Sequence, residues 1–555
     1  MLRELNHLSK RAKFIVILVV LLLITVCAYA QTPEWEWAVQ AGGTGKDRGL
    51  NICIDDSNNY YTTGFFEGPA TFGSCSLIGI GHWDIYVTKA DANCDWQFVS
   101  SAGSENGCDI SRAITVDGNG NLYVTGQFKR TAYFGSYSIT SNGMEDIFVA
   151  KLDKNGIWKW AVGAGGNGFD TGTGVVIDNS GDLYITGGCS ETASFGPYSY
   201  TSEGGTDIYV AKLDNDGNWL WVTGMGSSEF EYAYSIVQDG VGGQYITGYF
   251  NEIVTFGSHS LTSSGVGDIF VAKIDQDGVW QWATQAGGTG NDVSNSINID
   301  TSGNSYITGY FWDTAYFGTT TLISSGSTET YVAKLDTNGG WEWASQAGGV
   351  SCDNGNAICI DANGNSYITG KYMETFYFGT DSLTCVGDYD VFVAKLDTGG
   401  NWEWAVKAGG IDSDMGFGIA LDNEANCYVT GYFEDCSSFG SYLFTSSGDE
   451  DIFIAKLAPP VSTDPEINPE AGSLSNFPNP FNQRTTINYA LKRETAVYLE
   501  VYNLKGQLVE KLFEGISQAG DHTVEWDCQR MPSGVYFLKM KTGNEESIRK
   551  MVLLR

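Results

Sequence analysis

A unit of about 61 residues repeats along most of this chain, and it limits the fold more than any other feature. The pair Thr-Gly recurs with its glycine at 64, 126, 187, 248, 309, 370 and 431. The pair Phe-Gly recurs in phase, at Phe72, Phe134, Phe195, Phe256, Phe317, Phe378 and Phe439. Seven copies cover residues 35–457. Such a period is typical of folds in which one small unit is copied and packed against its neighbours.

Each copy has the composition of short strands joined by turns. In the copy at 297–343, runs rich in Ile, Val, Tyr and Thr alternate with D-x-x-G turns, which predicts strands at 297–300, 305–311, 330–336 and 341–346. The third strand is apolar on both sides, as expected for a sheet covered on both faces. Radial repetition of such sheets predicts an all-β, seven-bladed β-propeller at 31–457. A linear solenoid would need capping repeats, and no copy has the sequence of a cap.

The ends of the repeat region predict how the ring closes. An aromatic fourth strand begins at Trp35, Trp96, Trp158, Trp219, Trp280, Trp341 and Trp402, and the last copy stops after its third strand at 457. The N-terminal strand at 31–43 is therefore expected to complete the last blade, so that no edge of this kind stays unpaired.

Residues 1–30 are predicted to be a secretory signal peptide. Basic residues precede an apolar run that ends in Ala28-Tyr29-Ala30, so we expect cleavage before Gln31 and no stable membrane span afterwards. A lipoprotein signal through Cys27 is disfavoured by Val26, which stands where a small residue is wanted.

The charge of the repeat region excludes several classes of partner. Residues 31–469 hold 16 Lys and Arg against 55 Asp and Glu, within a net charge of −35 for the chain. A surface this acidic repels nucleic acid and anionic membranes. The eleven cysteines after Cys27 form no regular framework; pairing of Cys94 with Cys108 is one possibility in an oxidising compartment.

The composition changes after the last copy. Residues 458–473 are rich in proline and predict an extended linker. Residues 474–555 are nearly neutral and show short alternating strands, which predicts a small immunoglobulin-like β-sandwich.

Both regions resemble known families. The pattern GNxYxTGxF, FG, LTSxG and DIFVAKLDxNGxWxWAxxAGGxGxD resembles the bacterial β-propeller repeats called SBBP repeats, a family with no uniform activity. The C-terminal region resembles the type A sorting domain of the type IX secretion system, through motifs that include Pro478, Asn479, Pro480, Gly506, Gly534, Tyr536 and Lys550. Cys528 departs from that pattern, where Gly often follows Trp-Asp. The resemblance implies export through the periplasm by the type IX machinery, to the cell surface or the medium.

One ring of acids is the main candidate site. Asp47, Asp109, Asp170, Glu231, Asp292, Asp353 and Asp414 occupy one position of the repeat, in the loops before the first strands. Two uses are open. The carboxylates bind a divalent ion such as Ca²⁺ or a polycation at the channel mouth, or each accepts N–H bonds within its own glycine-rich loop. Residues that break the symmetry, namely Lys129, Arg130, Trp312 and Phe376, are further candidates for a specific site.

No sequence motif points to a catalytic centre. The repeat region holds only His82 and His259 and no metalloprotease, nucleophile-elbow or phosphate-loop motif. We expect a non-catalytic binding or scaffold protein for extracellular glycans or proteins, for example in adhesion, with no required cofactor. A polysaccharide lyase or hydrolase with a carboxylate site at the channel mouth stays open, since a glycosidase needs only two acids at a suitable separation. So does a structural component of the surface layer.

Overall fold

The computed structural model describes residues 32–459, 474–477, 481–491, 495–503, 507–518, 520–528, 531–542 and 545–553. The predicted signal peptide and most of the predicted linker lie outside these ranges. The described residues form two compact units that divide after residue 460. Within the described ranges, no helix has the length and apolarity that a membrane crossing requires.

Every copy of the repeat folds into antiparallel strands that pair in sequence order, first with second, second with third and third with fourth. The first strands are β2 (Arg48–Ile54), β8 (Ile110–Val116), β14 (Asp170–Ile177), β18 (Tyr232–Gln238), β24 (Val293–Ile299), β28 (Asn354–Ile360) and β34 (Met415–Leu421). The second strands are β3 (Tyr60–Phe66), β9 (Leu122–Phe128), β15 (Leu183–Phe195), β19 (Gln244–Phe250), β25 (Ser305–Phe317), β29 (Ser366–Tyr372) and β35 (Cys427–Phe439).

The third and fourth strands complete each sheet. The third strands are β6 (Asp84–Ala90), β12 (Asp146–Leu152), β16 (Tyr198–Leu213), β22 (Asp268–Ile274), β26 (Thr320–Leu335), β32 (Asp390–Leu396) and β36 (Tyr442–Leu457). The fourth strands are β7 (Trp96–Ser104), β13 (Trp158–Ala164), β17 (Trp219–Met225), β23 (Trp280–Gly288), β27 (Trp341–Ala347), β33 (Trp402–Gly410) and β1 (Trp35–Gly43). Successive side chains of a third strand are buried on both faces, as in Ile147 and Phe148 of β12, because neighbouring sheets cover both sides.

A hairpin between the second and third strands accounts for the length of the repeat. It forms separate strands in four copies: β4 (Pro69–Phe72) with β5 (Cys75–Ile78), β10 (Thr131–Phe134) with β11 (Tyr137–Thr140), β20 (Ile253–Phe256) with β21 (His259–Thr262), and β30 (Thr375–Phe378) with β31 (Asp381–Thr384). In the other three copies it continues the long strands. The Phe-Gly pair forms its turn: Gly73 has a φ of 59°, and buried Phe72 packs edge-on against Trp96.

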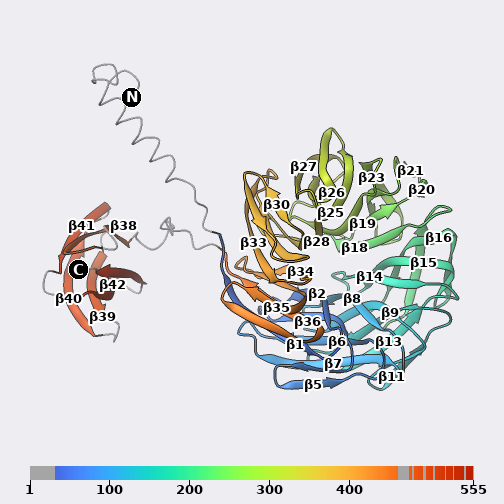
Figure 1. Ribbon diagram of the computed structural model, residues 1–555, viewed down its shortest axis with the longest axis horizontal. Helices are drawn as coiled ribbons and strands as arrows, with labels where there is room; N and C mark the ends of the chain where they lie inside the picture. Colours follow the sequence, from blue (N-terminus) through green and yellow to red (C-terminus); the bar gives the residue numbers. More distant parts are fainter. Residues whose placement is uncertain are drawn as a thin grey trace, which may run out of the picture. The chain divides into compact units, whose positions relative to one another are not determined.

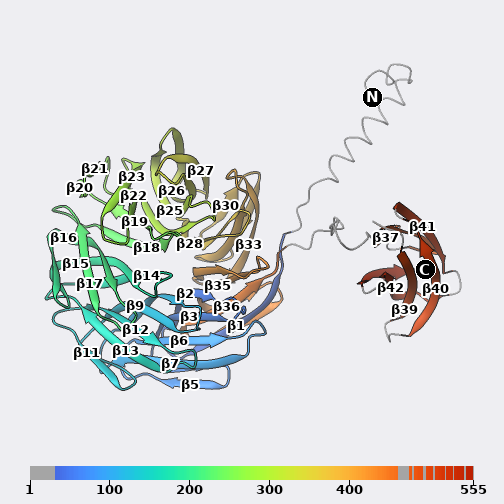
Figure 2. The same ribbon diagram turned by 180° about the vertical axis from the view of Figure 1, so that it is seen from behind.

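The N-terminal strand pairs with the last strand of the repeat region. β1 runs antiparallel to β36, with Ala38 opposite Ala455. Trp35 donates from its indole N–H to Lys407 O over 3.2 Å, as Trp402 does to Gln346 O in the copy before. The first strands also contact one another in succession, from β2 to β8 onward and from β34 back to β2. They surround the centre of the unit (Figure 1, Figure 2).

The second unit consists of two antiparallel sheets around one core. One sheet holds β37 (Leu474–Phe477), β38 (Arg484–Leu491) and β41 (Gly520–Asp527). The other holds β39 (Thr495–Asn503), β40 (Leu508–Ser517), β42 (Gly534–Thr542) and β43 (Glu545–Leu553). Residues from both sheets, such as Ile487, Trp526, Val501 and Leu538, share one buried cluster.

The suggested disulfide is wrong. Neither Cys94 nor Cys108 forms a disulfide. The two lie beyond opposite ends of the nine-residue strand β7, which at 3.3 Å per residue spans about 30 Å. A disulfide needs Cα atoms about 6 Å apart.

Candidate functional site

The seven acidic residues of the repeat are buried in the loops before the first strands, with exposed fractions of 0 to 1 %. Asp353 shows the common arrangement: Oδ2 accepts the N–H of Gly349 over 2.7 Å and Oδ1 that of Met373 over 3.1 Å. Residues at the same two positions donate to Asp47, Asp170 and Asp292. Each of these carboxyls joins its own loop to the segment after the second strand. Of the two uses considered from the sequence, this is the second, in which each carboxylate accepts N–H bonds within its own glycine-rich loop.

Burial changes the acidity of these groups. Loss of water raises the pKa to about 7 for Asp47, Asp292 and Asp353, and to about 8 for Asp414. Each third strand carries a second buried acid, and this acid adds repulsion, as Asp390 does for Asp414. Among the described residues, no three side chains of His, Cys, Asp or Glu form a group able to hold a metal ion. Calcium binding by the acidic positions stays a prediction.

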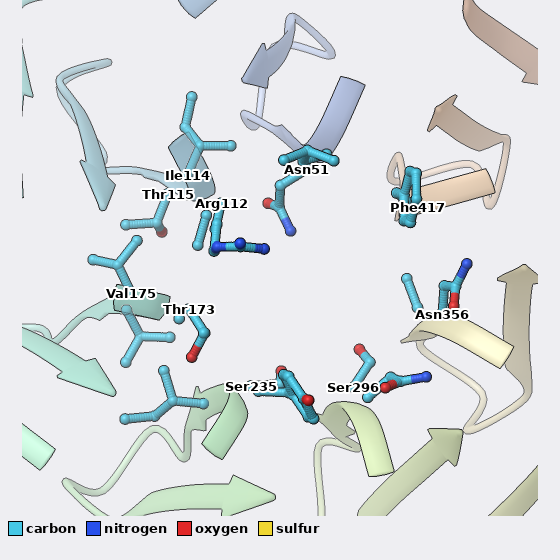
Figure 3. Close-up of a pocket in the computed structure, with 18 residues that line it drawn as sticks. Asn51, Arg112, Ile114, Thr115, Thr173, Val175, Ser235, Ser296, Asn356 and Phe417 are labelled. Carbon is cyan, nitrogen blue, oxygen red and sulfur yellow. The ribbon is translucent and has the colours of Figure 1, made fainter. Parts of the chain in front are cut away.

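A β-bulge occurs in every first strand, and the seven bulged residues line a central cavity of about 420 Å³ (Figure 3). They are Leu50, Arg112, Thr173, Tyr234, Asn295, Asn356 and Phe417. A bulge inserts one extra residue and redirects its side chain. Arg112 of β8 and Phe417 of β34 lie on either side of Asn51 of β2 in Figure 3. Each bulged residue follows Gly, Ala or Ser, whereas the bulge itself carries six residue types.

Three of the bulged side chains hold the next copy in place. Thr173 donates to Ala233 O, Asn295 to Gly355 O and Asn356 to Gly416 O, over 2.7 to 2.9 Å. These three residues therefore have a structural role. Of the remaining four, Arg112 is the one that brings a charge to the cavity.

Arg112 has no counter-charge in contact with it. Its Nε donates to Oε1 of Gln127 over 2.9 Å, and Nε2 of Gln127 donates to Oε2 of Glu145 over 2.7 Å. Within the described ranges, no carboxylate oxygen lies within the 4.0 Å of an ion pair with Arg112. Desolvation lowers the pKa of Arg112, yet a guanidinium stays protonated in proteins. The result is a fixed positive charge with unused N–H donors.

A second cavity of about 440 Å³ adjoins the first and shares Arg112, Thr173 and Tyr234 with it. We call it the side cavity. Its polar wall includes Gln127 and Glu145, and its aromatic wall includes Phe169, Phe230 and Tyr232. The rings of Tyr232 and Tyr234 stack at 6.1 Å and 11°. Phe169 and Phe230 are 48 % and 54 % exposed.

The other candidates from the sequence lie elsewhere. Arg130 is exposed in the turn before β10, Trp312 is half exposed and Phe376 is buried. Lys129 and these three residues line neither cavity.

An Asp follows each first strand and a Lys stands near the end of each third strand. The two form an ion pair in two copies, Lys212 with Asp178 and Lys273 with Asp239. The third-strand lysines instead share another contact, a position 4.6 to 5.6 Å from a second-strand tyrosine ring.

The structure describes part of the sorting-domain motif. Gly534 begins β42, and buried Tyr536 donates from its hydroxyl to Pro532 O over 2.8 Å. Lys550 lies in β43 opposite Phe537. Pro478, Asn479, Pro480 and Gly506 lie outside the described residues. Cys528 is buried, and its backbone N–H donates to Gln483 O.

The sequence reasoning missed the bulged residues. A usable signal was present, since all seven copies have Gly, Ala or Ser directly before this position and vary at the position itself. The segment after the second strand drew attention because it differs most in sequence, but its variation lies on the outer hairpins and their turns.

Comparison with known families identifies both regions. A family model described as a β-propeller repeat matches residues 281–310, and one described as a secretion system C-terminal sorting domain matches residues 475–554.

Whole-chain likenesses are more distant. An uncharacterised WD repeat-containing protein of Acanthamoeba polyphaga mimivirus is 24 % identical over an alignment of 502 residues, and the match covers 72 % of this chain and 36 % of that protein. The chain thus spans about a third of the length of this relative. PorZ, a surface component of the type IX secretion system of Porphyromonas gingivalis, is 12 % identical, with 93 % of this chain and 75 % of PorZ covered and a TM-score of 0.28.

An arabinoxylan arabinofuranohydrolase of glycoside hydrolase family 43 from Bacillus subtilis is 11 % identical, with 92 % of this chain and 96 % of the enzyme covered and a TM-score of 0.29. Likenesses at such TM-scores say nothing about the activity of this chain. The family matches identify two segments: the chain holds a β-propeller repeat at 281–310 and a secretion system C-terminal sorting domain at 475–554, and the sorting domain indicates export through the type IX system to the cell surface or extracellular space.

Proposed function

We propose that the repeat region is a closed, seven-bladed propeller that binds an extracellular glycan or protein in its central and side cavities. The observation that carries this proposal is the contrast within each first strand. The residue before the bulge is Gly, Ala or Ser in every copy, while the residue that faces the cavity changes. A structural need recurs in each copy, whereas a ligand with no sevenfold symmetry requires different side chains around the axis.

Closure of the ring is supported by the wrap-around contacts of β1. The strand pairs with β36, and the indole of Trp35 makes the contact to Lys407 that other copies make to the fourth strand before them. A closed ring fixes the bulged residues at set positions around the cavity, because no sheet edge is free to open.

We propose a binding role without catalysis. Asp170 lines the side cavity, but its two carboxyl oxygens accept N–H bonds from Gly166 and Ser190. Glu145 is then left as the carboxylate there that can engage a ligand. A glycosidase mechanism uses two carboxyl groups facing one bond, and the side cavity offers one.

A glycan and peptide array probed with the purified secreted protein tests this function. The screen is run with calcium and with a chelator, and any bound polysaccharide is assayed for new reducing ends. Binding without cleavage supports a recognition protein, and loss of binding in chelator would assign a role to calcium. Cleavage would establish an enzyme instead. Absence of binding on every array would favour a structural role in the surface layer.

A further inference from the structure

We propose that the side cavity recognises a neutral saccharide through two neighbouring hydroxyl groups, which bind between Arg112 and Glu145 while the sugar ring packs on the aromatic wall. The inference rests on the proposed binding function and assigns its ligand class. Three features of the cavity carry it: unused donors beside an unused acceptor, exposed aromatic rings in the same cavity, and the charge of the surrounding protein.

The polar wall has donor and acceptor capacity that the protein does not use. A guanidinium carries five N–H donors, and Nε of Arg112 donates to Gln127. Within the described ranges, no other hydrogen bond from Arg112 is formed, and Glu145 accepts a side-chain bond through Oε2 alone. Gln127 bonds to both residues and also accepts from Thr171 over 2.9 Å. The amide therefore holds Arg112 and Glu145 in a fixed arrangement with their free polar atoms available.

Neighbouring hydroxyls fit this arrangement because each is both donor and acceptor. Oxygen lone pairs accept from the guanidinium, and the hydroxyl hydrogens donate to the carboxylate. A group with acceptors alone, such as a carboxylate, pairs with Arg112 but is repelled by Glu145. A cation pairs with Glu145 but is repelled by Arg112. The chemistry of the wall thus favours a ligand that carries both functions without a net charge.

The aromatic wall supplies the apolar contact. Phe169 and Phe230 lie in the loops before β14 and β18, and about half of each side chain is exposed. Packing of such an exposed ring against an apolar surface is favourable, because both surfaces are removed from water. The carbon-bound hydrogens of a sugar ring provide such a surface, while its hydroxyls reach the polar wall.

A glycine makes room for one of the aromatic rings of the side cavity. Gly188 occupies the second-strand position that holds Phe65, Gln127, Tyr249, Tyr310, Lys371 and Tyr432 in the other copies. A Cβ at Gly188 would lie 2.6 Å from the ring of Tyr232. The missing side chain at Gly188 therefore leaves room for the ring of Tyr232 against β15.

The charge of the whole protein decides between neutral and acidic saccharides. With a net charge of −35, the surface repels a polyanion before it reaches Arg112. A neutral glycan meets no such barrier. We therefore expect the Arg112 guanidinium, which lies in an acidic protein, to bind the hydroxyl groups of a neutral saccharide in preference to a chain of uronates.

Binding of defined oligosaccharides to the purified secreted protein tests the proposal. The probes are cellohexaose, xylohexaose, mannohexaose and laminarihexaose, with hexagalacturonate as the acidic counterpart, each titrated calorimetrically at 0.15 M salt. We expect at least one neutral hexasaccharide to bind, and hexagalacturonate to bind at least ten-fold more weakly. Tighter binding of hexagalacturonate overturns the neutral class. Absence of binding by all five probes, with peptides bound on the array, overturns the saccharide while the binding function stands.

Three variants and one control locate the site. Arg112→Met keeps the apolar stem and removes the donors, and we expect affinity to fall about ten-fold or more. Phe230→Ala should cost about five-fold through lost ring contact. Glu145→Gln separates the two ligand classes. It weakens the binding of a neutral diol, which donates to the carboxylate, and it strengthens the binding of a uronate, which the carboxylate repels.

The control is Tyr377→Ala, which removes an equally exposed aromatic ring from the outer hairpin β30. It should change affinity less than two-fold. Thermal melting of all four variants checks that they remain folded. If folded Arg112→Met and Phe230→Ala bind like the parent protein, the ligand uses another surface and the side-cavity proposal is wrong.

Discussion

The acidic loop residues and the bulged residues each occur once per copy, and they vary in opposite ways. The first set is six Asp and one Glu, buried and bonded to backbone N–H groups. The second set has six residue types and faces a cavity. The fold needs a buried carboxylate that accepts the loop N–H groups in every copy, so the acidic position is constant. The bulge keeps only a small residue before it, so the bulged side chain itself is able to serve a ligand.

The comparison teaches how to separate structure from function in a repeat protein. Constancy across copies marks what the backbone geometry requires, even for charged residues that look functional. Variation at a position whose neighbours stay constant marks a side chain that the backbone does not need. The bulged position itself holds side chains of both kinds. Thr173, Asn295 and Asn356 bond to the next copy and are structural, whereas Arg112 makes no such bond.

Removal of residues 31–43 should have the largest effect, because it deletes a complete strand of a constant set. The deletion exposes the long edge of β36 and the buried partners of Ala38 and Ala41. We expect loss of a single cooperative unfolding transition, measured by circular dichroism on heating. A matched deletion of the outer hairpin β30–β31 should leave one transition. A truncated protein that melts like the parent would contradict ring closure.

Asp353→Ala should show the next largest effect, on stability alone. It leaves the N–H groups of Gly349 and Met373 without their buried acceptor. Each unpaired donor costs about 1–3 kcal/mol, and relief of the buried charge offsets part of this, so we expect about 2 kcal/mol in urea unfolding. Ligand affinity should be unchanged. A variant with parental stability and weakened binding would place the acidic ring in the ligand site.

The raised pKa values predict that the acidic ring makes the fold less stable as pH rises. Burial raises the pKa of Asp414 to about 8, so the folded state holds a proton that the unfolded chain releases near pH 4. This contribution is complete below about pH 4 and is lost as pH rises towards 8.

Asp414→Asn removes that titration, and urea unfolding at pH 5 and pH 9 should show a smaller loss of stability than in the parent. Asp117→Asn is the control, since bonds from Asn121 and its turn outweigh burial and lower the pKa of Asp117. Its parent carboxylate contributes stability above about pH 4, so the control should not reduce the alkaline loss. Equal pH dependence in Asp414→Asn and the parent would contradict the buried charge.

The junction of first and last copies has an ion cluster that the other copies lack. Glu450 accepts from Arg48, with Nη2 to Oε1 at 2.8 Å, and from Lys46 at 3.1 Å. Burial opposes ionisation of Glu450, but Arg48 and Lys46 hold its pKa below the usual value. Glu450→Gln should cost about 1 kcal/mol in urea unfolding, because Arg48 is partly exposed and water screens the pair. A cost of zero would show that backbone pairing alone closes the ring.

The phase of the repeat made the strands predictable, and local geometry limited the prediction of the site. The recurring Thr-Gly pair and the strand that begins with Trp predicted seven sets of strands. They also predicted that the N-terminal strand β1 completes the last copy, where it pairs with β36. The direction of the acidic side chains depends on how each glycine-rich loop folds back, which residue spacing does not reveal. The hairpin between the second and third strands was not among the four strands predicted for each copy.

The bulges were unpredictable for a definite reason. Strand faces are assigned from a period of two, and one extra residue reverses every later assignment in the strand. Alternation in β8 therefore does not show that Arg112 faces the cavity. The constant small residues beside it could have revealed the position, but not the direction of its side chain.

Phe417→Ala should have the smallest effect on stability, and it gives the sharpest test of the comparison. The ring is half-buried, faces the central cavity and contacts Tyr432 at 5.9 Å between centroids. Because water already reaches it, we expect a cost of about 1 kcal/mol or less in urea unfolding. Phe392, buried on β32, is the matched control, and Phe392→Ala should cost about 3–5 kcal/mol. Similar costs for the two substitutions would mean that the bulged positions support the fold as much as the core does, and variation between copies would then no longer identify the site.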